Sequence, residues 1–397
     1  MIKLLQARRL AAMLCAAGLA TWAAPSMAEW QTNFSGYGTV GAAKSNNDAQ
    51  FTRTPIQYRG ANRDWNLGVD TRLGLQGVAQ YDKFKVVGQL LTQRVGNEDV
   101  KPRVEWLFGN YAVTDWLDLR AGRMVLPLFV LSDTRNVGFS STWLRAPQEV
   151  YSLYPVTGVD GIQAVARFNI GNSVLTVQPS YGRTKGAYAL STLDTTIKLK
   201  MDKLASIMVN WEIGSWTLHL GKSRTDLSTH LGTAPGTITI PFPPFSVPFD
   251  ATLEPHDAKT KEEMDNVGVT FDNGTAILQA EYAKRHQNPG GYENEGYYLM
   301  GGWRFGKLTP YYVLGRYKPN SVVAGAIVGK SHAAGVRYDL SESVAIKAQF
   351  ERRDPVNLFF NRLPASPIPG FTNPPPLGWE TETKKINIVS VAVDFVF

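Results

Sequence analysis

The sequence predicts an all-β protein, a transmembrane up-and-down antiparallel β-barrel of sixteen strands with one constriction loop folded inward. Segments of about ten residues alternate apolar and polar side chains, which is the length that a tilted membrane strand needs. Short and long connections alternate between these segments. Mean hydropathy is −0.18, which suits strands that present one face to lipid and the other to water.

Residues 1–28 are typical of a secretory signal peptide that is cleaved after Ala28, because a basic start is followed by an apolar stretch and then by small residues. The stretch is shorter than the roughly 20 residues that cross a bilayer as a helix. We therefore expect two parts, the cleaved signal peptide 1–28 and a single barrel domain, 29–397. The one cysteine, Cys15, lies in the leader, so the exported part has no disulfide.

Sixteen segments carry the alternating pattern along the barrel domain. In the clearest, residues 65–81, Leu73 and Leu75 lie on one face while Arg72 lies on the other. The segments are centred near residues 36, 72, 89, 108, 119, 164, 178, 208, 220, 269, 280, 300, 313, 335, 348 and 391. Because the segments run from one end of 29–397 to the other, we expect them to form a single barrel.

The connections indicate how the strands are ordered. Short turns at 81–83, 114–115, 170–172, 214–215, 272–274 and 306–307 alternate with longer loops. That alternation indicates an up-and-down sheet with both chain ends on the short-turn side, whereas a soluble sandwich would mix its connection lengths. Two stretches rich in proline and phenylalanine, 236–249 and 361–379, are expected to be stiff loops. Each could cap the mouth of the barrel, dock on a neighbouring subunit or form a rigid outer surface.

The cost of burying charge in lipid predicts which way the strand residues face. An arginine at the lipid-facing midplane costs roughly 2 to 4 kcal/mol, so the charged side chains should point inward. The residues placed inward on this ground are Arg72, Arg304, Arg316, Arg337 and Lys347. An inner face with this many charged side chains must be hydrated. A barrel of sixteen strands is wide enough to leave an aqueous channel.

The last segment, INIVSVAVDFVF, ends on Phe397 and is expected to close the barrel with its Val and Phe face toward lipid. Together with the leader, the first strand segment QTNFSGYGTVGAAK and the sixteen-strand pattern, this ending resembles the porins of Gram-negative outer membranes. The resemblance covers the whole barrel domain. It implies a homotrimer of water-filled pores in the outer membrane, and a terminal Phe397 that is read by the barrel-assembly machinery.

A long segment after the fifth strand, residues 124–156, is too long and too apolar for a simple connection. We expect it to pack against the inner wall, and the family resemblance implies the same. Its charged residues should then narrow the pore opposite basic residues of the wall. The loop residues are Asp133, Arg135, Arg145 and Glu149, and the wall residues are Arg72, Arg120 and Arg123. The acidic PEFGG-type tip that is common in the family is absent, which puts its usual cation-leaning constriction in doubt.

Basic residues outnumber acidic ones among the side chains placed inside the barrel. The basic set is Arg72, Arg120, Arg167, Arg304, Arg316, Arg337 and Lys347, and the acidic set is Asp70, Glu281, Glu351 and Asp394. A lumen of net positive charge concentrates anions, so weak anion preference is one hypothesis. The other is that the charges pair and line a neutral passage.

The predicted function is passive diffusion of small hydrophilic solutes and ions, with no catalysis, cofactor, metal or nucleic-acid partner. One alternative is a channel selective for small anions such as carboxylates or phosphates, because arginines bind these bidentately. A second is an outer-membrane hydrolase barrel, although no G-x-S-x-G motif is present. The membrane lipid and lipopolysaccharide are the expected contacts. The mixed charges of residues 261–265 could meet lipopolysaccharide through divalent ions or form a solvated loop.

Overall fold

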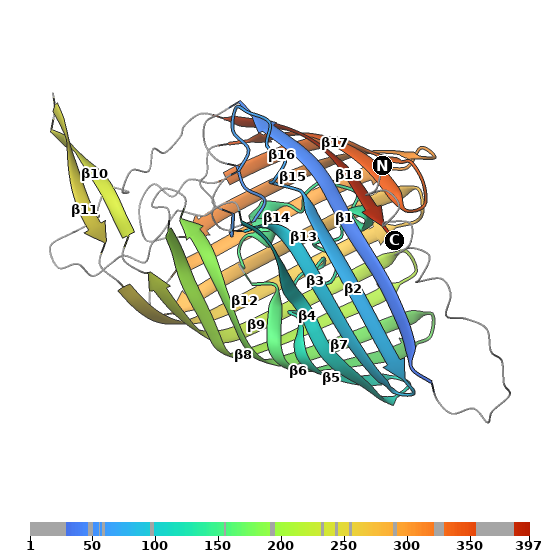
Figure 1. The fold of residues 1–397 in the computed structure, drawn as a ribbon. Coiled ribbons are helices and arrows are strands. Elements are labelled where there is room, and N and C mark those ends of the chain that lie inside the picture. Colours follow the sequence, from blue (N-terminus) through green and yellow to red (C-terminus); the bar gives the residue numbers. More distant parts are fainter. Residues whose placement is uncertain are drawn as a thin grey trace, which may run out of the picture.

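Sixteen strands form one closed antiparallel barrel in the computed structural model, as predicted (Figure 1). Each of the sixteen segments predicted from the sequence has its centre within one of these strands. The structure describes residues 29–46, 51–54, 56–57, 60–95, 99–154, 156–190, 195–231, 234–242, 245–253, 256–288, 292–320, 329–354 and 385–397. The signal-peptide prediction and the 361–379 loop prediction lie outside these residues.

The barrel strands are hydrogen-bonded in chain order, and the last pairs with the first. They are β1 (Gln31–Ser45), β2 (Arg72–Tyr81), β3 (Phe84–Val95), β4 (Asp99–Thr114), β5 (Leu117–Val125), β6 (Gly158–Ile170), β7 (Ser173–Leu190), β8 (Thr195–Ile213), β9 (Trp216–Leu231), β12 (His256–Asp272), β13 (Ala276–Asn288), β14 (Tyr292–Trp303), β15 (Leu308–Asn320), β16 (Gly329–Asp339), β17 (Val344–Arg353) and β18 (Ile386–Val396). Their lengths differ widely, from 9 residues in β5 to 19 in β8. The residues 261–265, expected either to meet lipopolysaccharide or to form a loop, lie within strand β12.

The segment 236–249, expected to be a stiff loop, forms most of a hairpin that was not predicted. Strands β10 (Ala234–Phe242) and β11 (Phe245–Leu253) pair with each other between β9 and β12. The hairpin stands apart from the wall in Figure 1. Alternating threonine and isoleucine in the first strand give it the β-branched residues that an extended pair favours.

Strand β2 begins later than the alternating pattern of residues 65–81 predicted. β2 starts at Arg72, so residues 65–71 precede it. Bridges join Phe51 to Ala61 and Ala43 to Asn66, which shows that the chain folds back before β2 begins. Val69 is then buried with Phe51 and Ala61 rather than exposed on a strand.

The outer and inner faces of the wall differ in the exposure of their side chains. Val389, Val391 and Val393 of β18 and the following Phe397 are exposed on the outer face, whereas Ser390 and Asp394 of β18 are buried inside. The register with β1 runs from Tyr37 opposite Val396 to Ser45 opposite Ile388. The predicted closing role of this strand, with its Val and Phe face outward, is confirmed.

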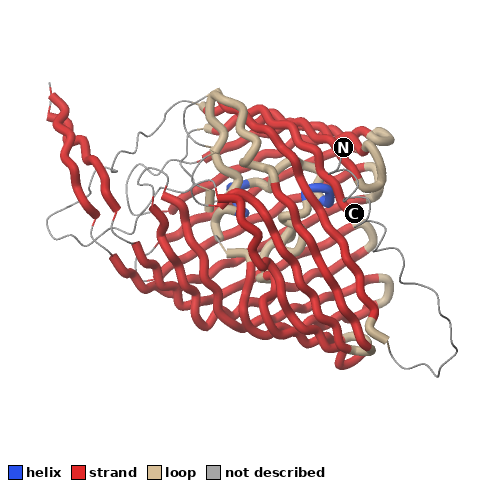
Figure 2. The backbone as a smooth tube through the Cα atoms, in the orientation of Figure 1, coloured by secondary structure: helices blue, strands red, loops and turns tan. Residues whose placement is uncertain are grey.

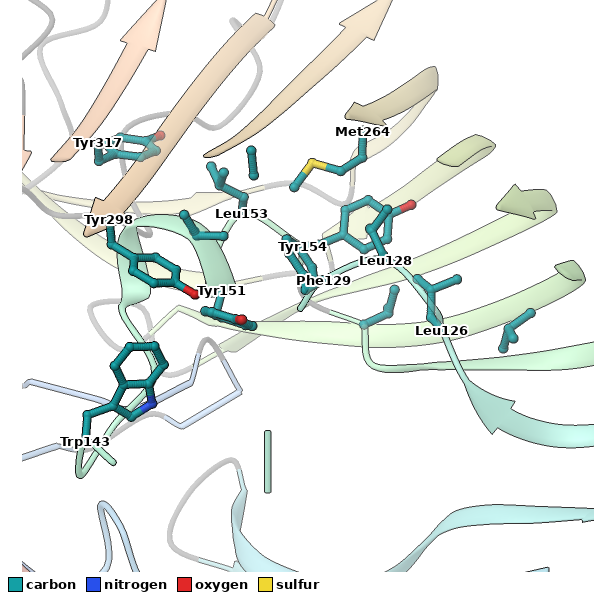
Figure 3. Close-up of a cluster of buried hydrophobic side chains, with 14 of the residues drawn as sticks. Leu126, Leu128, Phe129, Trp143, Tyr151, Leu153, Tyr154, Met264, Tyr298 and Tyr317 are labelled. Carbon is teal, nitrogen blue, oxygen red and sulfur yellow. The ribbon is translucent and has the colours of Figure 1, made fainter. Parts of the chain in front are cut away.

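The segment between β5 and β6, residues 126–157, folds into the barrel and is called the inward loop below. Figure 2 shows it as a tan segment inside the strands, with the 3-10 helix η1 (Gly138–Ser140) and the α-helix α2 (Gln148–Tyr151). Its apolar side chains form the main buried cluster of the protein together with wall residues such as Met264 and Tyr298 (Figure 3). The loop members labelled there are Leu126, Leu128, Phe129, Trp143, Tyr151, Leu153 and Tyr154. The core therefore lies inside the barrel. No helix in the described part of the chain is long and apolar enough to cross a membrane.

Candidate functional site

A buried carboxylate on β13 holds both an early and a late part of the inward loop against the wall. Glu281 accepts hydrogen bonds from the backbone N–H of Val130 (3.0 Å) and from the hydroxyl of Tyr151 (2.6 Å). Two wall residues, Asn266 and Tyr298, donate to it at 2.9 and 2.8 Å. Burial and the adjacent Glu281 carboxylate raise the pKa of Tyr151 well above its ordinary value, so its hydroxyl stays protonated and donates.

A buried cation on β17 holds the middle of the loop. The Lys347 ammonium donates to the carbonyl oxygens of Gly138 (2.7 Å), Ser141 (2.6 Å) and Trp143 (3.0 Å). It also lies 3.0 Å from the Asp394 carboxylate of β18. The loop has no sheet partner, so its carbonyl groups need donors from elsewhere, and Lys347 is one donor for three of them.

Other charged residues that were expected to line the pore also tie the loop to the wall. Arg145 makes a bidentate ion pair with Asp70, at 2.7 and 2.6 Å. Arg337 donates to the carbonyl oxygens of Phe139 and Ser141. Glu149 in α2 is buried against the wall, beside Gly315 of β15. Arg145 is matched by Asp70 and Arg337 also pairs with Asp339, so these two arginines add little free charge to the lumen.

A cavity of about 300 Å³ lies between the inward loop and strands β3, β4 and β7. The charged residues that line it are Arg103, Glu105, Arg123, Arg135, Asp160 and Lys185. Arg103 lies 3.2 Å from Glu105, and Arg123 pairs bidentately with Asp160. The Arg123–Asp160 pair lies at the outer border of this cavity and is neutral as a pair, so it adds no net charge to the lumen.

Arg135 of the loop also borders a second, smaller recess on the inner wall. The residues that line this recess include Arg53, Arg72, Arg135 and Arg145, and within the described ranges its lining contains no carboxylate. Arg53 donates to the side-chain oxygen of Gln93, and Arg72 donates to the carbonyl oxygen of Asn136 at 2.6 Å. Arg135 donates to the carbonyl oxygen of Tyr151 at 3.3 Å. These hydrogen-bond partners are neutral, so the three guanidinium charges are not cancelled by them.

Three more predicted site residues lie apart from this group of arginines. Arg120 faces inward on β5 and donates to Asn110 (3.0 Å) and Gln163 (3.3 Å). Asp133 is exposed on the inward loop. Arg304 follows the end of β14 and pairs with Asp272, so it lies at the short-turn edge of the barrel.

Two of the predicted inward arginines face outward, which corrects the expectation for them. Arg316 shares its face of β15 with the exposed Tyr312 and Leu314. Arg123 pairs in register with the exposed Leu107 of β4. The penalty for an outward charge applies at the lipid midplane, whereas Arg316 lies near the long-connection end of its strand and Arg123 is neutralised by Asp160.

Sequence reasoning missed Arg53 and Arg103 as lumen residues. A β-bulge places Glu105 as an extra residue in β4 and reverses the alternation there, so Arg103 and Glu105 face inward on one side of it and Asn110 on the other. The segment 103–106 contains no glycine, which would have been the local sequence signal of a bulge. Arg53 lies in the segment between β1 and β2, which carries no strand pattern.

A family model described as Gram-negative porin matches residues 11–357. The chain belongs to the Gram-negative porin family. It is therefore an outer-membrane channel protein, and the closed barrel with its inward loop is the channel wall. Among the residues that the structure describes, this porin has no group of three His, Cys, Asp or Glu side chains that could hold a metal ion.

Solved structures support the fold of this porin. The trimer form of in-vitro folded OmpT of Vibrio cholerae is 13% identical, with a TM-score of 0.56 over 93% of this chain and 99% of that one. An anion-selective porin from Comamonas acidovorans is 14% identical, with a TM-score of 0.56 over 93% and 100%. Salmonella typhi OmpF, in complex with daunomycin, is 11% identical, with a TM-score of 0.55 over 92% and 97%. No curated protein matches the sequence.

Proposed function

We propose that this porin passes small hydrophilic solutes and ions by passive diffusion, with a weak preference for anions and without catalysis. The observation that carries the preference is the group Arg53, Arg72 and Arg135, whose hydrogen-bond partners are neutral oxygen atoms. Positive charge within low-dielectric walls raises the local concentration of anions. The similarity in fold to an anion-selective porin agrees with this proposal.

Several other charged side chains of the lumen contribute little to the electric field in the passage, because they are paired with opposite charges. Arg145 is matched by Asp70, and Arg103 is matched by Glu105. Such pairs contribute mainly short-range dipoles, so the selectivity of the passage depends on the arginines with neutral partners. We therefore expect a modest effect rather than the exclusion of cations.

Reversal potential in a KCl gradient across a planar bilayer tests the preference. The wild-type channel is expected to favour chloride, and Arg53→Gln with Arg135→Gln should lower the chloride-to-potassium permeability ratio by about twofold. The matched control is Lys222→Gln with Arg224→Gln, two cations on the outer face that pair with Asp265 and Glu263. A zero or cation-selective potential in the wild type, or equal shifts in both double variants, would contradict the proposal.

A channel selective for small anionic solutes is the second candidate, favoured by the arginine-lined recess. Guanidinium groups bind carboxylates and phosphates bidentately, so a bound anion would occupy the recess for a measurable time. Flux of a dicarboxylate into liposomes distinguishes the two. A linear dependence on concentration supports general diffusion, whereas saturation supports a binding site.

We further propose a homotrimer, and a role for Phe397 in recognition by the barrel-assembly machinery. The trimer form of the Vibrio cholerae protein, which has a similar fold, supports the first. Native mass spectrometry of the protein released from detergent tests it, since a trimer gives three times the protomer mass. A protein that has the mass of a single protomer and still conducts ions would contradict the trimer and show that one protomer is enough to form a channel.

A further inference from the structure

The connection between β1 and β2 contains a short folded segment that contacts the inner wall. Its described residues, 51–54, 56–57 and 60–61, are called the strap below. Phe51 and Ala61 pair through both of their backbone N–H groups, with N···O distances of 2.9 and 2.7 Å, so the chain doubles back on itself here. A Cβ atom on Gly60 would lie 1.8 Å from the carbonyl oxygen of Phe51, so this close pairing needs glycine at that position.

The Phe51 ring contacts two guanidinium groups from different parts of the protein. The Cζ atoms of Arg145 on the inward loop and of Arg353 on β17 each lie 5.0 Å from the ring centroid. The ring is only 7% exposed, and a desolvated aromatic face attracts a cation at this distance. Glu351 lies 2.5 Å from Arg353 and 3.6 Å from Arg145, so it holds both cations beside the ring. Phe51 therefore joins the strap to the inward loop and to the wall at the same point.

Polar contacts extend the strap from β17 to β3. The Gln148 side chain in α2 donates to the carbonyl oxygen of Thr52 and accepts from Arg353 at 3.1 Å. Arg53 donates to the side-chain oxygen of Gln93 on β3, which is buried on the inner face. In the order of the barrel, β18, β1 and β2 lie between β17 and β3. The strap therefore crosses the inner side of five neighbouring strands.

The strap also borders the passage. Thr54 and Ile56 line the cavity of about 300 Å³ beside the inward loop, and Arg53 lines the smaller recess of arginines. Arg353 is the last residue of β17, and Gln93 is the third from the end of β3, so both contacts lie toward the long-connection mouth of the barrel. A solute that enters from that mouth therefore passes the strap as well as the inward loop.

We propose that the strap is a second constriction element of this porin, and that Phe51 is the positioning residue that holds it across the passage. Loss of the ring removes its contacts with the two guanidinium groups and its place in the buried cluster with Val69 and Ile388. The strap then leaves the wall, the passage widens and Arg53 leaves the recess. The effect of Arg53 on selectivity rests on the proposed anion preference, whereas the constriction is independent of it.

A cysteine reporter tests whether the strap lies in the passage. Cys15 lies in the leader, so Ile56→Cys gives the mature chain a single thiol. A negatively charged methanethiosulfonate reagent should lower the conductance of each open protomer by about a third, because the added group occupies the cavity beside the inward loop. Ser343→Cys, exposed at a short turn, is the matched control and should react without a change in conductance. Complete reaction of the Ile56→Cys thiol by mass spectrometry, with unchanged conductance, would overturn the proposal.

Two substitutions of Phe51 test its positioning role. Phe51→Tyr keeps the aromatic face, whereas Phe51→Leu keeps an apolar side chain without that face. We expect Phe51→Leu to raise the single-channel conductance by about 1.5-fold and to speed thiol reaction in the Ile56→Cys background by about fivefold, and Phe51→Tyr to stay within about 20% of the wild type in both. Resistance of the barrel to heat in SDS shows that both variants are folded.

The outcomes separate the second constriction from the anion preference. Equal conductance and equal thiol reaction in the Phe51→Leu and Phe51→Tyr variants would show that the aromatic face does not hold the strap, and would overturn the positioning role. A channel without chloride preference whose conductance still falls on modification of Ile56→Cys would contradict the proposed selectivity and support the second constriction.

Discussion

Single buried ionic groups determine how the inward loop is held. Glu281 accepts four hydrogen bonds, two from the loop and two from the wall, and Lys347 donates to three loop carbonyl groups. A buried charge stabilises the folded loop only when its hydrogen-bonding groups are satisfied, and nearly all of those of Glu281 and Lys347 are. Removing the charge of either one should therefore loosen the loop without opening the barrel.

Glu281→Gln is the sharpest test at this scale, because it keeps the size of the side chain. The new amide group would place donor hydrogens toward the hydroxyl groups of Tyr151 or Tyr298, which already donate. We expect a loss of about 1–3 kcal/mol from the loop contact, seen as larger fluctuations in the open-channel current and faster proteolysis within residues 126–157. Glu295→Gln on the outer face is the control and should behave like the wild type.

Residue-level prediction from the sequence succeeded where the strand alternation was regular. Asp394 and Lys347 face inward as expected, because β17 and β18 contain no bulge. Arg316 was misplaced because the cost of a lipid-facing charge was applied to a strand end, although the alternation with Leu314 and Tyr312 alone predicts an outward side chain. The hydrogen-bond partners of Glu281 had no sequence signal, because they come from segments 15 to 151 residues away.

At the scale of elements, the inward loop depends on glycine in the wall as much as on its own apolar residues. A Cβ atom on Gly296 of β14 would lie 1.8 Å from the carbonyl oxygen of Glu149 in α2. A Cβ atom on Gly221 of β9 would lie 2.1 Å from the carbonyl oxygen of Leu128. Loop backbone and wall backbone are thus in direct contact at two well-separated points.

Gly296→Ala should displace α2 from the wall and toward the passage. The methyl group cannot fit beside a backbone oxygen at that distance, so the loop must move by about 1 Å or more. We expect a lower single-channel conductance and a broader distribution of conductance levels. Gly301→Ala on the same strand is the control, because its Cβ atom would meet only the Leu278 side chain at 3.6 Å. Identical conductance in the two variants would show that α2 does not border the passage.

The existence of the elements was easier to predict than their ends. Sixteen strands follow from period-two alternation, which a membrane wall imposes on every strand. The start of β2 and the hairpin β10–β11 were missed. Residues 65–71 continue the alternation of β2, although Asn66 bridges to Ala43 of β1 and Val69 packs with Phe51 and Ala61. Proline in the segment 236–249 masked an extended pair.

For the whole molecule, the last strand closes the wall through its final residue. The backbone N–H of Phe397 donates to the carbonyl oxygen of Gly36 (3.0 Å), and the N–H of Gly36 donates back (2.8 Å). The Phe397 ring covers Gly36, where a Cβ atom would lie 2.3 Å from it. The first and last strands are therefore fitted to each other in shape as well as in register.

Phe397→Ala tests whether this residue acts in assembly or in stability. The backbone pairing with Gly36 survives the change, so refolding in detergent and resistance of the barrel to heat in SDS should stay close to those of the wild type. In cells, we expect a several-fold lower amount in the outer membrane. Phe350→Ala removes another outward ring, from β17, and serves as the control. Equal amounts of both variants in the membrane would argue against an assembly role.

The unequal strand lengths have a consequence for the outer rim of the barrel. At about 3.3 Å per residue, the 9 residues of β5 reach less than half as far as the 19 of β8. The 9 residues of β5 are about enough to cross the hydrocarbon region as a tilted strand, whereas β8 extends well beyond it on the long-connection side. The outer rim of the barrel is therefore uneven, and its tall side is the one that large molecules approaching the cell would meet first.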